Sequence, residues 1–481
     1  MSLLDALRQE NVTTENGMAT NSSSLNAVVD LFYNIGAMRG QDKERLISQF
    51  SLAFATDSNR AMKILFWVRD VRGGAGERQI FRDIMSYLAK NYKDSLAKNL
   101  QYISEYGRWD DLLVLAGTDL QHEAFSLISD AIKAGDGLAA KWMPRKGVIA
   151  AKLRNHMDMS PKEYRKTLVE LTSVVETLMC AKKWEDIDFS KLPSVASARY
   201  QKAFWKNAKD SYEMYVNRLQ KGETKINAGA LYPYDVIKSL THGDRRVATE
   251  QWKALPNFLE NADEMILPMV DTSGSMTCPA GGNPNVTCMD VALSLGLYIS
   301  ERNEGKFKDA FLTFSGSPAL QYLKGDLGQR YEQLRRSDWA MNTNIEAAFK
   351  LILDQGVKHK VPQNEMPDKI LILSDMQFDS AISTKSYGWT RNDNMTEWNL
   401  TAQKMIEKMY TDAGYKTPKI VYWNIQSRNG DVPVAFDKAG TALISGFSPA
   451  ILTSLLGGKS FSPVAIMDDT ILSARYEKIT A

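Results

Sequence analysis

The stretch Met265–Ser275, MILPMVDTSGS, decides the fold of this chain. Its first six residues are apolar without polar alternation, which is typical of a strand buried on both faces of a parallel sheet. The carboxylate of Asp271 and the hydroxyls of Ser273 and Ser275 follow at every second position. Ligands of open α/β sheets bind at the carboxyl ends of the strands. Because oxygen ligands suit hard cations, this stretch predicts a site for Mg²⁺ at a strand end.

Two further stretches complete the predicted site. Residues 369–375, KILILSD, form a second buried strand pattern that ends in Asp375, and Thr343 lies in the polar turn at 341–344. A ligand-free turn would explain Ser273 and Ser275, but it would not explain Thr343 and Asp375 in this order. A Gly-x-Ser-x-Gly motif is absent from the sequence, which disfavours a nucleophile elbow. The predicted metal ligands are Asp271, Ser273, Ser275, Thr343 and Asp375.

This set resembles the metal-ion-dependent adhesion site of von Willebrand factor A domains: the pattern DxSxS, then a Thr, then a strand-end Asp. The resemblance implies a doubly wound α/β domain at residues 263–481 that binds Mg²⁺ or another divalent cation. It also implies an open coordination position that a carboxylate of a protein partner can fill. We find no general base or nucleophile beside these residues, so we predict that the chain is not an enzyme. The enzymatic alternative is a metal-dependent hydrolase.

Length and composition narrow the class of protein. A chain of 481 residues with 24% charged residues is typical of a globular protein of about two to four domains. A net charge of +2 gives no overall attraction to nucleic acid. Three cysteines provide no disulfide framework, and no apolar run reaches membrane-spanning length. We therefore expect a cytoplasmic monomer without a membrane partner.

The chain before the sheet has a helical pattern. Residues 1–24 contain a polar run and are predicted to be a flexible arm. Over residues 25–262, apolar residues recur at helical spacing and helices follow one another after short breaks, which predicts irregular helical repeats. From residue 263 strand and helix patterns alternate, as in a doubly wound sheet. We predict three parts: arm, helical domain and α/β domain.

Several phrases of the helical part resemble an uncharacterised family similar to the TROVE proteins, to which the Ro ribonucleoprotein autoantigen belongs. They are RGGAGER at 72–78, YGRWDDL at 106–112, KWMPRK at 141–146 and KINAG at 225–229. The resemblance implies HEAT-like α-helical repeats that close into a ring, followed by the A domain. It also implies that the ring binds RNA.

The helical part contains a run of basic residues that fits this expectation. Residues 141–166 hold eight basic residues against Asp158 and Glu163. Such a run can neutralise phosphates, although it can equally be a solvated helix face. Residues 199–225 repeat the pattern with seven basic and three acidic residues. We name the first group the basic strip: Lys141, Arg145, Lys146, Lys152, Arg154, Lys162, Arg165 and Lys166.

Aromatic residues near the basic strip leave the partner open. Trp142, Tyr164 and Tyr200 could stack on bases or belong to the core. The first functional hypothesis is an RNA-binding scaffold that resembles Ro ribonucleoproteins and recognises structured small RNA, with a Mg²⁺-binding A domain for partner recognition. The second is an adaptor that binds an acidic partner residue through the metal and does not bind RNA.

Overall fold

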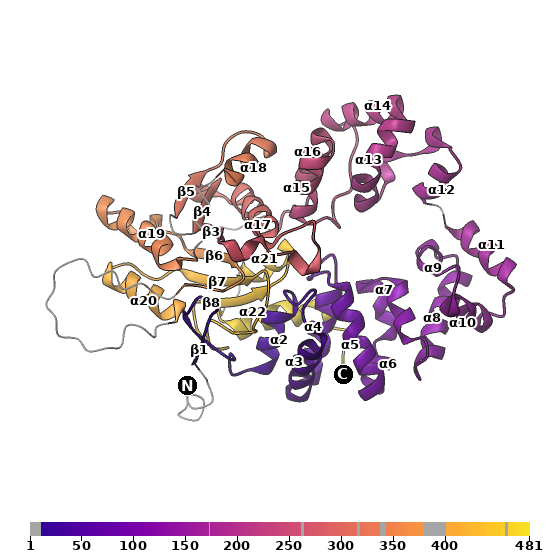
Figure 1. Cartoon of the computed structure of the whole chain (residues 1–481), viewed down its shortest axis with the longest axis horizontal. Helices are drawn as coiled ribbons and strands as arrows, with labels where there is room; N and C mark the ends of the chain where they lie inside the picture. The colour runs from indigo at the N-terminus through magenta and orange to yellow at the C-terminus, as the bar shows by residue number, and fades with distance from the viewer. Residues whose placement is uncertain are drawn as a thin grey trace. The chain divides into compact units, whose positions relative to one another are not determined.

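The computed structural model describes residues 11–172, 174–260, 264–314, 318–336, 343–379, 401–456 and 460–481. The chain forms two compact units (Figure 1). The sheet unit contains Met1–Thr56 and Asn257–Ser473, and the helical unit contains Asp57–Pro256 and Ala474–Ala481. Every helix within the described ranges is too short or too polar to span a bilayer.

The sheet unit is built on six strands in the order β5-β4-β3-β6-β7-β8 (Figure 1). All neighbouring pairs are parallel except β4 and β5, which pair antiparallel at one edge. Strands β3, β6 and β8 are buried along their whole length because their sequences are almost entirely apolar. The strands are β3 Ile266–Asp271, β4 Ala310–Phe314, β5 Ala319–Tyr322, β6 Lys369–Ser374, β7 Lys419–Asn424 and β8 Thr441–Ser445.

The order of the strands places the predicted site. From β3 the chain first builds β4 and β5 on one side, and then crosses to β6 on the other side of β3. Such a reversal of strand order opens a crevice at the carboxyl ends of the two central strands. In the parallel register Val270 lies opposite Leu373, so Asp271 and Asp375 both lie at this edge. The predicted doubly wound α/β fold is confirmed.

Helices cover the sheet, and glycine allows one of them to approach closely. Helix α17 packs on β3, β4 and β6, and 12 of its 15 residues are buried. A side chain at Gly296 of this helix would begin 2.4 Å from the ring of Phe311. The helices of this part are α17 Cys288–Arg302, α18 Leu327–Arg335, α19 Ile345–His359, α20 Ala402–Asp412, α21 Leu452–Leu455 and α22 Pro463–Ile471.

Two amino-terminal helices belong to the sheet unit, contrary to the predicted start of the helical domain at residue 25. Helix α2 (Ala27–Ile35) packs against β8, and α3 (Lys43–Thr56) packs on α2. The backbone N–H of Gly36 donates to the Ser445 hydroxyl at 3.1 Å. Helical periodicity correctly predicted these helices, but it contains no information about which layer their apolar faces cover.

The predicted flexible arm is wrong for residues 11–24. Strands β1 (Asn11–Thr13) and β2 (Ala19–Asn21) form an antiparallel hairpin. The Thr14 hydroxyl donates to the Phe378 carbonyl at 2.6 Å, and the backbone N–H of Asn21 donates to the Val432 carbonyl at 3.1 Å. The polar residues that resembled a disordered run instead form hydrogen bonds within the sheet unit. Residues 1–10 lie outside the described residues.

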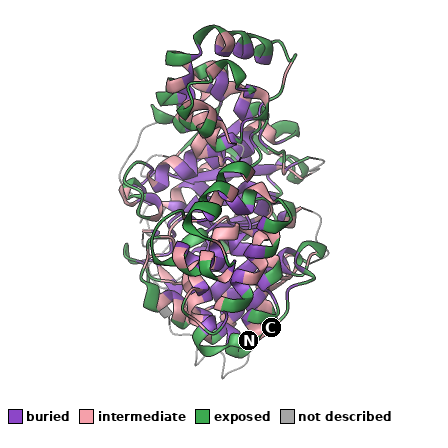
Figure 2. Cartoon of the chain, turned by 90° about the vertical axis from the view of Figure 1, so that its right-hand side faces the viewer, coloured by how far each residue is buried: buried purple, intermediate pink, exposed green. Residues whose placement is uncertain are grey.

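The helical unit confirms the predicted succession of helices. Sequential helices pack in pairs, such as α4 with α5, α13 with α14 and α15 with α16. These helices carry both buried and exposed residues (Figure 2). The helices are α4 Ser58–Arg69, α5 Arg78–Asn91, α6 Lys93–Ala97, α7 Ile103–Tyr106, α8 Gln121–Lys133, α9 Gly137–Trp142, α10 Val148–His156, α11 Pro161–Leu171, α12 Val175–Cys180, α13 Ser194–Asn207, α14 Lys209–Gln220, α15 Pro233–His242 and α16 Arg245–Lys253.

The last residues of the chain belong to the helical unit, although the predicted α/β domain extended to residue 481. Asp70, at the end of α4, is only 1% exposed. Its carboxylate accepts hydrogen bonds from the Arg475 guanidinium at 2.8 Å and from the Tyr476 hydroxyl at 2.9 Å. The Tyr476 ring also stacks on Tyr106, with 5.5 Å between centroids. This tail therefore neutralises a buried carboxylate of the helical unit.

Candidate metal centre and basic surface

Asp271 is the buried centre of the predicted metal site. It is the last residue of β3, and its side chain is fully shielded from solvent. Oδ1 accepts from the backbone N–H of Ser273 at 2.9 Å, and Oδ2 accepts from the Ser374 hydroxyl at 2.5 Å. The Ser273 and Ser275 hydroxyl oxygens lie 3.0 Å apart. The DxSxS turn thus gathers its oxygens at the end of the strand, as its spacing predicted.

Asp375 supplies a second buried carboxylate at the same edge and is 1% exposed. Its Oδ1 accepts from the backbone N–H of Gln377 at 3.4 Å, whereas Oδ2 has no hydrogen-bond donor in the described structure. A guanidinium nitrogen of Arg428 lies 3.4 Å from Oδ2 but does not form a hydrogen bond with it. That guanidinium donates to the Ser275 carbonyl at 2.9 Å. Oδ2 of Asp375 therefore lies near the positive charge of Arg428 but accepts no hydrogen bond in the described structure.

The two carboxylates disturb each other electrostatically. Burial, and then the charge of Asp375, raises the pKa of Asp271 to about 7. Burial also raises the pKa of Asp375, while the charge of Arg428 and the Ser275 hydroxyl lower it. Arg428 also pairs with Glu15 at 3.3 Å, so one guanidinium faces two carboxylates, those of Glu15 and Asp375. A divalent cation would remove this excess of negative charge, and the residues present fit such an ion.

Thr343 lies at the same edge and is linked to the site through the amino-terminal hairpin. Thr343 is 1% exposed. The Asn16 side-chain amide donates to its hydroxyl at 3.3 Å and to the Gln377 carbonyl at 2.6 Å. The backbone N–H of Glu15 donates to the Gln377 side chain at 2.7 Å. The hairpin turn thus joins the Thr343 loop to the loop that follows Asp375.

Three residues of this centre were not predicted from the sequence. Ser374 orients Asp271, Arg428 contacts Asp375, and Asn16 connects the Thr343 and Gln377 loops. Ser374 directly precedes a predicted ligand, and that position was its only signal. The described residues contain no group of three or more His, Cys, Asp or Glu side chains that could hold a metal. The candidate set instead combines two carboxylates with hydroxyls.

Two cysteines lie beside the centre. The sulfur atoms of Cys278 and Cys288 are 3.5 Å apart and unbonded, and the Gln426 side-chain oxygen lies 2.6 and 2.9 Å from them. Contact with Cys288, and then the charge of Arg428, lowers the pKa of Cys278 to about 6 despite its partial burial. The same contact and burial raise the pKa of Cys288. Of the two sulfurs, Cys278 is therefore the one that loses a proton first.

The basic strip lies on α9, α10, α11 and their connections in the helical unit. Lys141 and Arg154 are half-buried, and the other six residues are exposed. On α11, Lys162, Arg165 and Lys166 have the i, i+3, i+4 spacing that places side chains on one helix face. Lys166 also forms an exposed ion pair with Glu170 at 3.6 Å, a contact that contributes little in water.

The aromatic residues near the basic strip already make contacts within the protein. Tyr164 is 2% exposed and its hydroxyl donates to the Pro144 carbonyl at 3.1 Å, so stacking on a base is wrong for Tyr164. Burial raises its pKa to about 12, and the nearby charges of Arg145 and Arg154 lower it. Trp142 is half-buried, with the Arg108 guanidinium 3.6 Å from its ring centroid. The Tyr200 hydroxyl donates to Glu176 at 3.0 Å.

Two comparisons with known proteins match nearly the whole chain. The chain is 29% identical over 519 aligned positions to the uncharacterized protein L728 of Acanthamoeba polyphaga mimivirus, covering 94% of this chain and 86% of that protein. The crystal structure of the Deinococcus radiodurans RO (RSR) protein matches 94% of this chain and 100% of its own, at 13% identity. The TM-score of this match is 0.46.

Family comparisons account for nearly all of the sequence. Residues 265–476 match the family described as domain of unknown function DUF7788. Residues 14–132 and 145–265 match the family described as domain of unknown function DUF2828. The DUF2828 match is therefore followed along the chain by the DUF7788 match.

Proposed function

We propose that the sheet unit binds Mg²⁺ at the end of β3 and β6 and uses it to recognise a carboxylate of a partner protein. Asp271, Ser273, Ser275, Thr343 and Asp375 would hold the ion. The observation that carries this proposal is the Oδ2 atom of Asp375, which is buried beside a second carboxylate and has no hydrogen-bond donor in the described structure. The Arg428 guanidinium 3.4 Å away is shared with Glu15, so the two buried carboxylates keep an excess of negative charge that a divalent cation would neutralise.

The ion, when bound, would supply positive charge to the two carboxylates and a point of attachment for an acidic ligand. The chain's own residues orient the ligands. Ser374 and the Ser273 backbone hold both oxygens of Asp271, and Asn16 holds the Thr343 hydroxyl. Glu15 is exposed beside Asn16 and pairs with Arg428 at 3.3 Å.

We propose binding rather than catalysis at this centre. A serine nucleophile commonly needs a neighbouring histidine as base. Within the sheet unit, His359 is the last residue of α19. That helix begins next to the Thr343 loop and rises about 1.5 Å per residue. His359 is therefore roughly 20 Å away from the site.

A titration with Mg²⁺ tests the proposal. Isothermal titration calorimetry of the full chain should show one Mg²⁺ site, and the combined changes Ser273→Ala and Ser275→Ala should abolish it. The matched control changes Ser294 and Ser300 of α17 to Ala, because their hydroxyls donate to backbone carbonyls of that helix. Equal Mg²⁺ binding by the site variant and the control would contradict the proposal.

A second proposed function is RNA binding by the helical unit through the basic strip. It is supported by the exposure of six of the eight residues and by the shared helix face of Lys162, Arg165 and Lys166. Phosphate contacts of this kind bind RNA without reading its sequence. Structured RNA is therefore the partner we propose for this unit, and the adaptor without RNA is the alternative.

Charge reversal tests the RNA proposal. Changing Arg145, Lys146, Lys152 and Lys162 to Glu should weaken binding of structured RNA and lower the slope of log K against log salt by about 3, since each phosphate contact contributes roughly 0.7 to 0.9. The control reverses four exposed lysines of the same unit outside both basic segments: Lys90, Lys133, Lys182 and Lys183. The adaptor is favoured instead if both variants retain the affinity and the salt slope of the unchanged protein.

A further inference from the structure

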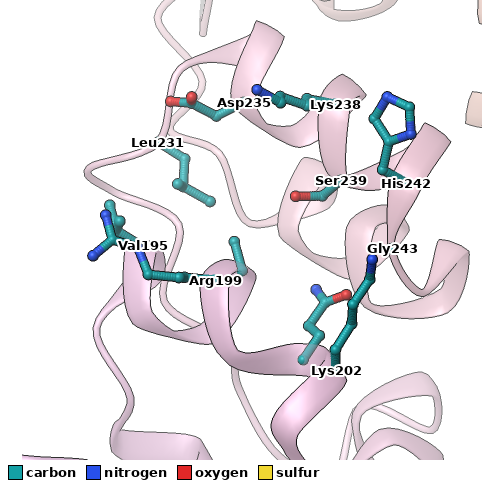
Figure 3. Close-up of a pocket in the computed structure, with 11 residues that line it drawn as sticks. Val195, Arg199, Lys202, Leu231, Asp235, Lys238, Ser239, His242 and Gly243 are labelled. Carbon is teal, nitrogen blue, oxygen red and sulfur yellow. The ribbon is translucent and has the colours of Figure 1, made fainter. Parts of the chain in front are cut away.

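Helices α13 and α15 of the helical unit line an open pocket of about 510 Å³ (Figure 3). Residues of α13 form one wall, and residues of α15 and the turn before it form the other. Figure 3 shows Leu231 and Ser239 turned towards the space between the helices, with Arg199 and Lys202 at its margin. This volume is in the range of pockets that hold a small organic ligand, roughly 300 to 1,000 Å³.

The pocket is rich in cations. Arg199 and Lys202 line it from α13, and Lys238 lines it from α15. Among the described ion pairs none joins these three side chains to a carboxylate. Asp235 is the acidic residue of the lining, and its Oδ2 already accepts from the backbone N–H of Tyr232 at 3.1 Å. The lining therefore has an excess of positive charge.

Gln201 adds a buried donor without a partner. It lines the pocket and is only 4% exposed. Its Oε1 accepts from the backbone N–H of Asp244 at 3.0 Å, whereas its Nε2 has no hydrogen-bond partner in the described structure. The N–H of Asp244 can only donate, so this contact determines which end of the amide is the oxygen. A buried amide donor is thus left for a ligand acceptor.

The remaining wall is apolar. Val195 and Ala198 of α13 and Leu231 before α15 line the pocket, and Val195 is 47% exposed. The complementary ligand therefore combines an anionic group rich in acceptor oxygens with a less polar body. A phosphate satisfies several donors at once, and a nucleoside covers the apolar wall.

We propose that this pocket binds a nucleoside monophosphate, either as a free nucleotide or as the phosphorylated end of an RNA chain. Arg199, Lys202 and Lys238 bind the phosphate, Gln201 Nε2 donates to an acceptor oxygen of the ligand, and the apolar wall covers the base or sugar. The alternative with RNA ends as ligand rests on the proposed RNA binding of the helical unit. The alternative with free nucleotides as ligand does not.

Calorimetry with four probes tests the pocket directly: adenosine 5′-monophosphate, adenosine 3′-monophosphate, adenosine and inorganic phosphate. At least one monophosphate should bind about tenfold more tightly than adenosine or phosphate alone, because only it uses both the cations and the apolar wall. The combined changes Lys202→Glu and Lys238→Glu, one on each wall, should weaken that binding by about tenfold or more. The control, Lys206→Glu with Lys209→Glu, reverses neighbouring exposed lysines that do not line the pocket and should bind unchanged.

Competition identifies the source of the ligand. Displacement of the bound monophosphate by a ten-nucleotide RNA with a terminal phosphate, but not by the same RNA without it, assigns the pocket to RNA ends. Failure of both RNAs to displace it assigns the pocket to free nucleotides. Protein with the basic strip reversed should keep its affinity for the monophosphate, so failure of RNA binding by the strip is distinguishable from failure of the pocket. The inference is overturned if neither monophosphate binds, or if the Lys202/Lys238 variant binds it as tightly as the control.

Discussion

Replacing Asp271 by Asn in the metal-free protein tests the electrostatics of the candidate centre. The substituted amide retains the shape of the side chain and can still accept from the Ser273 backbone N–H, but the change removes one of the two buried charges. Asp271 has a folded-state pKa of about 7 against 3.8 for an unperturbed carboxyl. A group with a raised folded pKa stabilises the fold below its unfolded pKa and loses that contribution as pH rises through the folded value.

The size of the effect follows from the two pKa values. The rise from 3.8 to about 7 corresponds to roughly 4 kcal/mol at about 1.4 kcal/mol per pKa unit. Between pH 5 and pH 8 the protein should lose roughly 3 kcal/mol of this folding stability. For a unit of this size, about 2 °C per kcal/mol gives a fall of about 6 °C in the melting temperature. The Asp271→Asn protein should lack this part of the fall.

Differential scanning calorimetry in EDTA at pH 5, 6, 7 and 8 measures the difference between the two proteins. The variant should become progressively more stable than the unchanged protein as pH rises. Added Mg²⁺ should restore the unchanged protein at pH 8 much more than at pH 5, because the cation then compensates charges that protons no longer neutralise. Asp271→Asn should respond weakly to Mg²⁺ at both values. A difference that stays constant with pH, with no Mg²⁺ effect at pH 8, would refute the reasoning.

Three further predictions concern other parts of the chain. Alkylation of Cys278 by iodoacetamide, followed by mass spectrometry, should reach its plateau rate near pH 7 because its pKa is lowered to about 6; a rate that still rises towards pH 9 would contradict this. Gly76→Ala should destabilise the helical unit much more than Gly222→Ala. Both residues have φ near +72°, but only at Gly76 would the added Cβ collide with another atom, the Tyr232 hydroxyl oxygen 1.7 Å away. Equal melting temperatures of the two variants would exclude this steric reason. Deleting residues 474–481 should lower the stability of the helical unit by about 3 kcal/mol because Asp70 stays buried without Arg475 and Tyr476, and urea unfolding that is unchanged would show that the tail contributes nothing.

The sequence alone was sufficient for the features that depend on local pattern. The apolar runs at 265–270 and 369–373 predicted central strands because only residues buried on both faces lack polar alternation. The oxygen-bearing residues that follow them were predicted to meet because parallel strands end at one edge, and the structure places Asp271 and Asp375 there. The start of α11 is also encoded locally, because Ser160 and Glu163 form a capping box around Pro161.

Only the tertiary structure decided which distant segments meet. The hairpin at 11–21 supplies Asn16 to Thr343, the loop after β7 supplies Arg428 to Asp375, and the last residues supply Arg475 to Asp70. Each contact joins residues far apart in the sequence, so its free energy depends on packing around both partners and on the entropy of closing the chain between them. Periodicity reports that a face is buried. It does not report which surface covers that face, so the layer of α2 and the pocket that α13 and α15 line together could not be predicted from the sequence.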